Sequence, residues 1–241
     1  MKVIAEKSEE MGLELNVKKT VCMVMSRKPN IPGCNLKHKG EIIQQVDKFS
    51  YLGFTLSSDG TCTAEIKKRI DVAKDSFNKM RPIFKNRNLR LSTKIRVLKA
   101  YVWSVLLYGC ECWKITKEAE RRLEAAEMWF LRRMMNISWK DKVSNEKVLL
   151  QCGTIRSMLK TIRKRQLTFL GHIHRKNSVE RLVTTGKIDG KKSRGRPRIA
   201  FVDSLRKWTE LDVTNTDFMR MAEDRQQWRA MVANVCNRQS T

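Results

Sequence analysis

The sequence predicts a mainly α protein, in which a small antiparallel β-hairpin region comes first and helices form the middle and the C-terminal region. Strand-like alternation of apolar residues is confined to about the first 60 residues, and from residue 63 to residue 174 apolar residues recur at steps of three and four. Since 41% of the 241 residues are hydrophobic, the chain can bury a sizeable core. We therefore expect a folded protein built largely of helices.

The first 60 residues contain all of the expected strands. A helical pattern over residues 1–11 should end at Gly12, because glycine accepts the left-handed conformation of the C′ position. Apolar residues alternate over 13–15 and again over 21–25, and residues 36–46 are typical of a hairpin. An aromatic strand over 49–56 follows, and the polar residues after it have turn chemistry.

Two helices are expected next, over residues 63–84 and 92–107. Pro82 and the loop over residues 85–88 should end the first, and Ser92 can cap the second. Trp103 and Tyr108 are interpreted as core residues of the second helix. The charged face of the first helix is basic, through Lys67, Lys68, Lys74, Lys79 and Arg81.

Thr116 can cap a further helix that runs to about Met134, and its expected partner is a helix over residues 155–174. A short helix over 145–151, ended by Gly153, would join them. The polar side of the 155–174 helix is crowded with cations, namely Arg156, Lys160, Arg163, Lys164 and Arg165. Residues 186–199 are rich in glycine, lysine and arginine, which favours an extended linker, and two short helices are expected within 200–241.

The charge of the chain predicts a polyanionic partner. Fifty lysines and arginines against 25 acidic residues leave a net charge of +25, and residues 154–208 alone contain 16 basic and 3 acidic residues. Such an excess favours nucleic acid, RNA or DNA, as the partner. An anionic membrane surface is the rival, but the predicted helices can bury their apolar faces. We expect an intracellular, nuclear protein without a membrane anchor, whereas nothing here indicates an oligomeric state.

The seven cysteines do not form a regular pattern. Their odd number and irregular spacing argue against a disulfide framework and for a reducing compartment. A zinc site could combine Cys152 with His172 and His174, but two residues two apart on a helix point about 200° apart and cannot chelate from one face. We therefore predict no metal site and no cofactor in this chain.

Several sequence blocks carry a family resemblance. Residues 12–20 read GLELNVKKT, Tyr51-Leu52-Gly53 lies in the predicted aromatic strand, residues 169–173 read FLGHI, and residues 195–198 read GRPR with Phe201, Asp203 and Trp208 after them. In this order the blocks resemble the reverse transcriptases of non-LTR (LINE-type) retrotransposons, in which a YLG-bearing hairpin called the primer grip precedes the thumb helices. The joint match extends over most of the chain.

The resemblance implies a division of the chain. Residues 1–60 would be the edge of the palm with the primer-grip hairpin, 61–110 thumb-like helices, 111–185 a basic helical region, 186–199 a basic linker with Arg-Gly-Arg-Pro, and 200–241 C-terminal helices. The family is an RNA-directed DNA polymerase that uses two metal ions. Its catalytic carboxylates should precede residue 1, and no Asp-Asp pair occurs in this chain. We therefore expect the chain to bind template–primer and target DNA without polymerising, with Mg²⁺ needed only by the complete polymerase.

The resemblance also suggests roles for single residues. Lys19 matches the lysine of the GLxxNxxKT block, which would assist nucleotide addition; the other interpretation is an exposed strand lysine. Tyr51, Leu52 and Gly53 would hold the primer end, or form a plain sheet-edge cluster. From charge, the further candidates for nucleic-acid binding are Lys67, Lys68, Lys74, Arg163, Lys164, Arg165, Lys191, Lys192, Arg194, Arg196 and Arg198.

The sequence is also compatible with a second class of function. Arg194-Gly195-Arg196-Pro197 is similar to the AT-hook core, in which an extended backbone lies in a narrow minor groove and the arginines follow its floor. The chain would then be a stand-alone DNA-binding or chromatin protein. A basic linker would have the same four residues. The sequence alone leaves open whether the chain is a truncated copy of a retroelement or a recruited host protein.

Overall fold

The structure is a computed structural model, and it describes residues 2–26, 30–185 and 201–238. The fold is mainly α, with strands only in small two-stranded sheets among the described residues, as the sequence predicted. Contacts divide the chain into two compact units, Met1–Lys68 and Arg69–Thr241. The boundary falls inside a helix, after the residue 60 boundary expected from the sequence. Within the described ranges, no helix is both long and apolar enough to cross a membrane.

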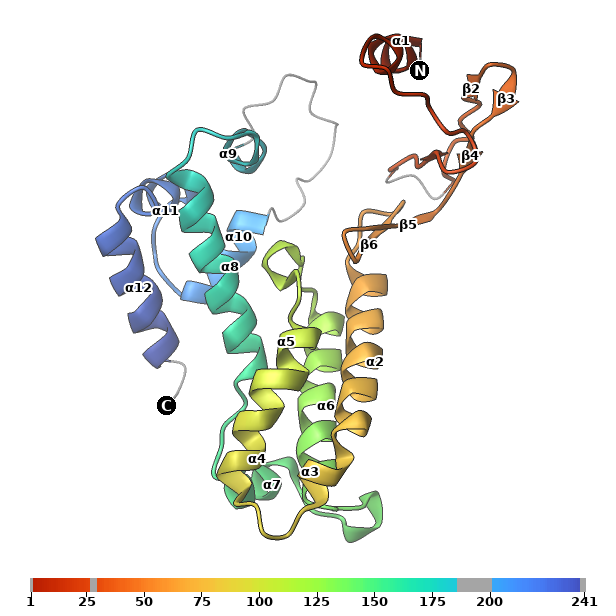
Figure 1. The fold of residues 1–241 in the computed structure, drawn as a ribbon. Coiled ribbons are helices and arrows are strands. Elements are labelled where there is room, and N and C mark those ends of the chain that lie inside the picture. The colour runs from red at the N-terminus through yellow and green to blue at the C-terminus, as the bar shows by residue number, and fades with distance from the viewer. Residues whose placement is uncertain (1, 27–29, 186–200, 239–241) are drawn as a thin grey trace. The chain divides into compact units, whose positions relative to one another are not determined.

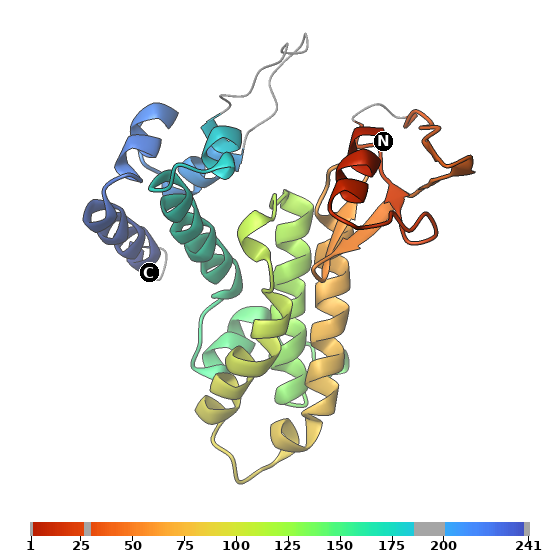
Figure 2. The same ribbon diagram turned by 45° about the horizontal axis from the view of Figure 1, so that its top comes forward.

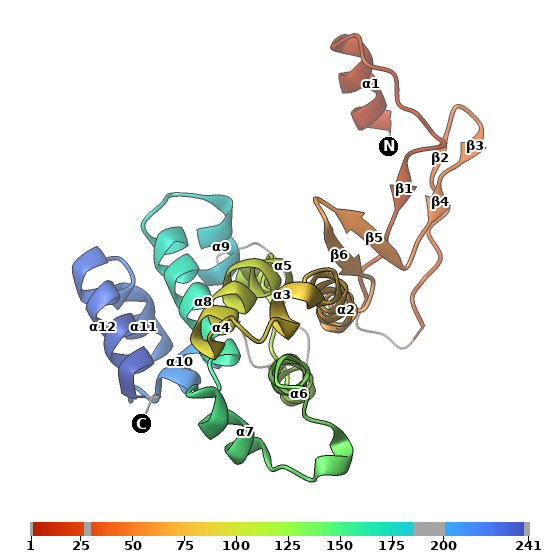
Figure 3. The ribbon, with the colours of Figure 1, turned by 60° about the horizontal axis from the view of Figure 1, so that its bottom comes forward.

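Unit 1 contains α1, Lys2–Glu10, and six short strands that pair two by two. Gly12 has φ of +72° after α1, which confirms the predicted helix end. β1 (Val21–Cys22) pairs in parallel with β4 (Gln44–Gln45), and Figure 3 shows the two side by side. The predicted strand over residues 13–15 is wrong, and of 21–25 only β1 is a strand. The backbone turns at Asn16, as the sequence indicates, since Asn16 accepts hydrogen bonds from the backbone N–H groups of Lys19 and Thr20.

Two hairpins follow in unit 1. β2 (Lys37–His38) and β3 (Glu41–Ile42) are antiparallel and joined by a turn at Lys39 and Gly40, both with positive φ. β5 (Lys48–Tyr51) and β6 (Phe54–Ser57) form an antiparallel hairpin. The single aromatic strand predicted over 49–56 is therefore wrong, because the chain turns at Leu52 and Gly53, both with positive φ. The start of α2 stabilises this second hairpin, because Glu65 accepts a hydrogen bond from the Thr55 N–H (2.7 Å) and Lys68 donates to the Thr55 hydroxyl (3.1 Å).

The first helices of unit 2 differ from the predicted boundaries. α2 runs over Thr63–Lys79 and ends at Met80, and α3, Arg81–Lys85, is separate. The reason is Pro82, whose ring clashes with the carbonyl four residues before it and which lies in the first turn of α3. α4 (Leu91–Val97), a π-helical turn η1 (Leu98–Val102) and α5 (Trp103–Leu106) form one continuous helical stretch. The predicted Ser92 cap is wrong, because Arg90 is at the N-cap and makes no side-chain capping bond.

The central helix is α6, Lys117–Met134, which follows the 3-10 turn η2 (Cys110–Cys112). Thr116 caps it as predicted, by accepting from the Ala119 N–H. α6 runs beside α2 in Figures 1 and 2, and the rings of Phe77 and Phe130 lie 5.4 Å apart between them. Trp103 is buried, but the prediction for Tyr108 is wrong: it is 51% exposed, with the Arg69 guanidinium 4.4 Å from its ring centroid.

After α6 come η3 (Trp139–Asp141) and α7 (Asn145–Cys152), which Gly153 ends in the left-handed conformation, as predicted. α8 spans Met158–His174 rather than starting at residue 155. It begins at Met158 because the buried carboxylate of Glu127, on α6, accepts the backbone N–H groups of Ser157 and Met158. α8 therefore packs against α6, the partner expected from the sequence.

The helices that follow α8 in the chain pack against it. This C-terminal part contains α9 (Val179–Thr185), which was not predicted, α10 (Phe201–Thr209), α11 (Asn215–Met221) and α12 (Arg225–Arg238). α12 lies alongside α8 in Figures 1 and 3. Gly171 permits this packing, since a Cβ there would lie 2.4 Å from the Trp228 indole, which donates a hydrogen bond to the Leu167 carbonyl. The core of this part is formed by Leu167, Leu170, Val202, Leu205, Phe218, Trp228 and Val232.

Candidate nucleic-acid interface

The outward side of α6 carries a basic, aromatic surface within unit 2. Arg121, Ala125, Trp129 and Arg132 follow one another at steps of three and four, so they share one side of the helix. Leu123 and Phe130 point the other way and are buried. The apolar stripe that anchors α6 in the core thus leaves a second stripe of cations around Trp129 at the surface.

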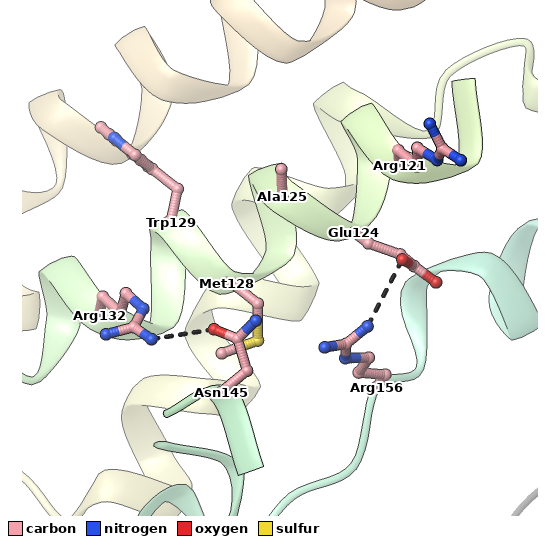
Figure 4. A pocket seen from close by; sticks show the side chains of 8 residues that line it. All are labelled: Arg121, Glu124, Ala125, Met128, Trp129, Arg132, Asn145 and Arg156. Atoms are coloured by element: carbon pink, nitrogen blue, oxygen red, sulfur yellow. Dashed lines mark hydrogen bonds and ion pairs between the residues drawn. The ribbon is translucent and has the colours of Figure 1, made fainter. Parts of the chain in front are cut away.

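The first hollow on this surface has a volume of about 460 Å³. Figure 4 shows the side chains that line it, which are Arg121, Glu124, Ala125, Met128, Trp129, Arg132, Asn145 and Arg156. Arg156 lies 3.4 Å from Glu124, and Arg132 donates to the Asn145 side chain (2.9 Å) and the Val143 carbonyl (2.7 Å). These contacts connect α6 to α7 and to the segment before α8, and they hold two of the three arginines in place.

A second hollow, of about 450 Å³, adjoins the first, because Trp129 and Arg132 line both. Its aromatic floor includes Phe77 and Phe84, whose rings stack at 4.4 Å, and Trp129, whose ring meets Phe77 edge-on at 5.6 Å. Its other lining residues are Asn78, Arg81, Lys85, Arg132, Arg133, Asn136, Ile137, Ser138 and Trp139. We call the residues that line the two hollows the Trp129 surface.

Charge on the Trp129 surface is predominantly positive. Six cationic side chains line the two hollows, with one acid, Glu124. Two cations also lie against the Trp129 ring, with the Arg133 guanidinium 5.0 Å and the Lys74 ammonium 5.9 Å from its centroid. Because like charges gather here with little neutralisation, the surface should attract a polyanion.

The predicted primer-grip residues occupy the tip of the β5–β6 hairpin in unit 1. Tyr51 ends β5, and Leu52 and Gly53 form the turn with φ of +48° and +78°. Both Tyr51 and Leu52 are exposed, Leu52 to 75%. A leucine in the left-handed region costs about 1–2 kcal/mol, which glycine or asparagine would avoid. This tip therefore presents two large side chains to solvent on a backbone that is strained at Leu52.

The predicted lysines of α2 lie in different surroundings. Lys67 is exposed, and Lys68 is exposed apart from its hydrogen bond to Thr55. Lys74 pairs with Asp71 (3.3 Å) and its ammonium lies 5.9 Å from the centroid of the Trp129 ring, so it is the α2 lysine of the predicted set that lies next to the Trp129 surface. Lys19 lies in the turn after Asn16 and is exposed, so it is not a strand lysine.

Arg163 requires a correction. It was predicted to contact nucleic acid, but it is only 5% exposed. Its guanidinium lies 3.3 Å from Glu120 and donates to Gln166 and to Ser204 of α10. Burial lowers the pKa of Arg163, and Glu120 opposes that shift. Arg163 is therefore a packing residue that connects α8 to α6 and α10.

The neighbours of Arg163 are more accessible. Lys164 is exposed, and Arg165 is exposed while donating to the Leu107 carbonyl (3.1 Å). The other predicted cations, Lys191, Lys192, Arg194, Arg196 and Arg198, lie outside the described residues, and the linker and the Arg-Gly-Arg-Pro sequence lie there with them.

Other arginines between 154 and 208 also serve packing. Arg175 donates to the Ala222 carbonyl (2.9 Å), Arg181 pairs with Glu223 (2.6 Å), and Arg206 donates to Asn215 and to the Val213 carbonyl. The high charge density of this segment therefore overstates the number of cations that are available to a ligand.

No group of three or more His, Cys, Asp or Glu side chains that could hold a metal ion occurs in the described part of the chain. His172 is exposed and His174 is buried, which agrees with the expectation that they point apart. Burial raises the pKa of the Cys110 thiol to about 12, so this cysteine is a poor nucleophile at neutral pH.

Most residues of the Trp129 surface are not among the candidates selected from the sequence. Arg121, Arg132, Arg133 and Arg156 were not selected, nor was Trp139. The signal that could have found the α6 residues is their spacing, which repeats on the side opposite the apolar stripe. Arg156 and Trp139 have no such signal, since only the chain path after α6 brings them to this surface.

Comparisons with known proteins add no name to this arrangement: no protein-family model matches the chain, and neither a curated protein nor a solved structure does.

Proposed function

We propose that this chain is a nucleic-acid-binding part of a non-LTR reverse transcriptase, which holds template–primer through its phosphates and supplies no catalytic carboxylates. The observation that carries the proposal is the Trp129 surface, where six cations and one acid line two adjoining hollows. Cations that contact phosphates position a nucleic acid without reading its sequence, which is the task of a polymerase thumb.

The hairpin tip supports the same proposal independently. Tyr51 and Leu52 are exposed, and the positive φ of Leu52 is a strained feature of the kind that clusters at functional sites. Gly53 lets another backbone approach closely. A primer terminus would be held by such a tip through stacking and backbone contact, while unit 2 makes its own contacts to phosphates.

The C-terminal blocks that resemble the family have a structural role that is compatible with this proposal. Leu170 and Gly171 of the first block and Phe201 and Trp208 of the second pack around one cluster of apolar side chains. The described residues of the two blocks thus pack together in one core.

The test is a binding titration of the full chain against a labelled RNA–DNA hybrid, measured by fluorescence anisotropy over a range of salt concentrations. Each phosphate contact releases condensed counterion, so log affinity should fall with log salt by about 0.9 per contact on a duplex of B-DNA type. We expect a slope of several contacts, and no nucleotide incorporation on a primed template with Mg²⁺ or Mn²⁺. Absence of binding at low salt would refute the proposal, and template-dependent extension would refute the lack of catalysis.

The alternative function is an AT-hook-like DNA-binding protein. Deleting residues 186–198, which contain six basic residues and one acid, distinguishes it from the proposed function. If Arg194 and Arg196 enter a minor groove, changing both to Ala should weaken binding to A/T-rich duplexes more than to G/C-rich ones. Equal losses on both duplexes would instead indicate a basic tether. An unchanged salt slope in the deletion variant would leave the Trp129 surface as the main source of phosphate contacts.

A further inference from the structure

The second hollow of the Trp129 surface has a feature that phosphate binding alone does not use. Trp139 lines it and is 83% exposed, although burying an aromatic side chain of this size would be favourable. An exposed tryptophan that forms the wall of a hollow is available to stack on a planar group from outside the chain.

The backbone that carries Trp139 is well supported. Asn136 ends α6 in the left-handed conformation, and the Ile137 N–H donates to the Arg132 carbonyl (2.9 Å). A capping box then closes η3, in which the Ser138 N–H donates to the Asp141 carboxylate at 2.6 Å. Trp139 is therefore presented from an ordered turn, so that less conformational entropy is lost when a ligand stacks on it.

The charges at the hollow specify the rest of the ligand. Arg81, Lys85, Arg132 and Arg133 line it, and no acid does so among the described residues. Arg133 is held over the Trp129 ring, and Arg132 is held by Val143 and Asn145. A ligand with an aromatic face and negative charges beside it would match Trp139 and these cations together.

The size of the hollow excludes a duplex as the group that enters. About 450 Å³ lies within the roughly 300–1,000 Å³ range of pockets that hold small ligands. Bases inside a duplex are stacked on each other and cannot offer a face to a protein ring, whereas bases of a single strand can.

We propose that this hollow binds single-stranded nucleic acid, with a base stacked on Trp139 and the adjacent phosphates at Arg81 and Arg133. This inference rests on the proposed nucleic-acid binding and adds a substrate class to it. Unpaired template ahead of a template–primer duplex, or a displaced strand, would have this chemistry.

The experiment compares the full-length protein and its Trp139→Ala variant by fluorescence anisotropy with a labelled oligothymidylate and with a labelled RNA–DNA hybrid. Base–aromatic stacking contributes about 1–3 kcal/mol per base, so we expect the oligothymidylate affinity to fall about 5- to 150-fold. The hybrid affinity should change by less than about twofold, because phosphate contacts remain. Since the side chain is exposed, the fold should be retained, which a thermal melt checks.

Three controls make the result specific. Trp139→Phe should keep most of the affinity, since phenylalanine still stacks. Leu150→Ala removes a highly exposed apolar side chain elsewhere, on α7, and should not change the affinity for oligothymidylate. Oligonucleotides with abasic sites should bind the wild-type protein as weakly as Trp139→Ala binds the intact strand.

The outcomes distinguish this inference from the proposed function. If the hybrid binds and Trp139→Ala binds oligothymidylate normally, the stacking site is wrong while the phosphate-binding proposal stands. Equal losses on single strand and hybrid would also overturn it. If polyglutamate of matched charge displaces oligothymidylate as well as unlabelled oligothymidylate does, the hollow is an acidic-peptide site. If the wild-type protein binds neither nucleic acid, both proposals fail.

Discussion

Unit 2 uses arginine in two different ways, and the contrast separates charge content from charge availability. In the region of α8 to α12, Arg163, Arg175 and Arg206 direct their guanidinium groups at carbonyl, carboxylate or amide oxygens of neighbouring helices. On the Trp129 surface, the side chains of Arg81, Lys85 and Arg121 make no hydrogen bond or ion pair with another described residue. The arginines of the first region are thus used for packing, whereas Arg81, Lys85 and Arg121 are available to a ligand.

The physical cause of the contrast is the desolvation of charge. A guanidinium has five N–H donors, and when a helix pair covers it each donor needs an oxygen partner. Arg163 directs three of these donors at Glu120, Gln166 and Ser204. Arg81, Lys85 and Arg121 on the Trp129 surface are exposed and make no such internal bonds, so they can exchange water for phosphate oxygens.

The largest expected effect tests the packing role of Arg163. Arg163→Met should lower the free energy of unfolding by about 2–3 kcal/mol, because Glu120 and Gln166 would lose their partner. Urea denaturation measures it, and Lys164→Met on the exposed side of α8 is the matched control, expected to change stability by less than about 0.5 kcal/mol. A loss of nucleic-acid affinity by Arg163→Met without a loss of stability would reverse our assignment.

A second variant tests the same packing without any charge. Gly171→Ala would place a Cβ against the Trp228 indole, and we expect a destabilisation of about 1–3 kcal/mol from overpacking, despite the better helix propensity of alanine. Trp228→Phe in the same background removes part of the indole. A double-mutant cycle should therefore give a favourable coupling between the two changes, and additive losses would mean that the indole simply moves aside.

Two double variants test whether the cations of the Trp129 surface are available to nucleic acid. Arg81→Gln with Arg133→Gln should weaken binding to an RNA–DNA hybrid about tenfold or more and reduce the salt slope by one to two contacts. Stability should be unchanged to within about 0.5 kcal/mol. Lys94→Gln with Arg96→Gln on α4 removes the same net charge away from both hollows. Equal weakening by both pairs would indicate general attraction rather than contacts at this surface.

The smallest expected effect concerns pH. Burial lowers the pKa of His174, the nearby Arg181 adds to the shift and Glu223 opposes it. Near pH 6.5 the His174 side chain therefore binds a proton more readily in the unfolded chain than in the folded chain. The free energy of unfolding should fall as the pH drops below 6.5, by up to about 1.4 kcal/mol per pH unit. His174→Gln should remove this slope in thermal melts between pH 7 and pH 5.5. His172→Gln, at an exposed position, should preserve it.

Local chemistry was predictable to the extent that short-range contacts decide it. The turn after β6, the Thr116 cap and the Gly153 helix end depend on residues within one turn of each other, and the structure confirms them. The end of the helix expected over 63–84 was misplaced by a few residues. α2 already ends before Met80, because Pro82 disrupts the helical turn that precedes it. The start of α8 was missed because it is capped by Glu127, some thirty positions away, whereas its end at His174 was predicted correctly.

The sequence by itself determined the mainly α fold class, the confinement of strands to the first part of the chain, and the high positive charge, because periodicity and composition are properties of neighbouring residues. Only the tertiary structure decided that Arg163 is buried, that Tyr108 is exposed, and that Arg81, Trp129, Trp139 and Arg156 meet on one surface. Helical spacing states which side chains share a face, but whether a neighbouring helix covers that face depends on how distant segments pack.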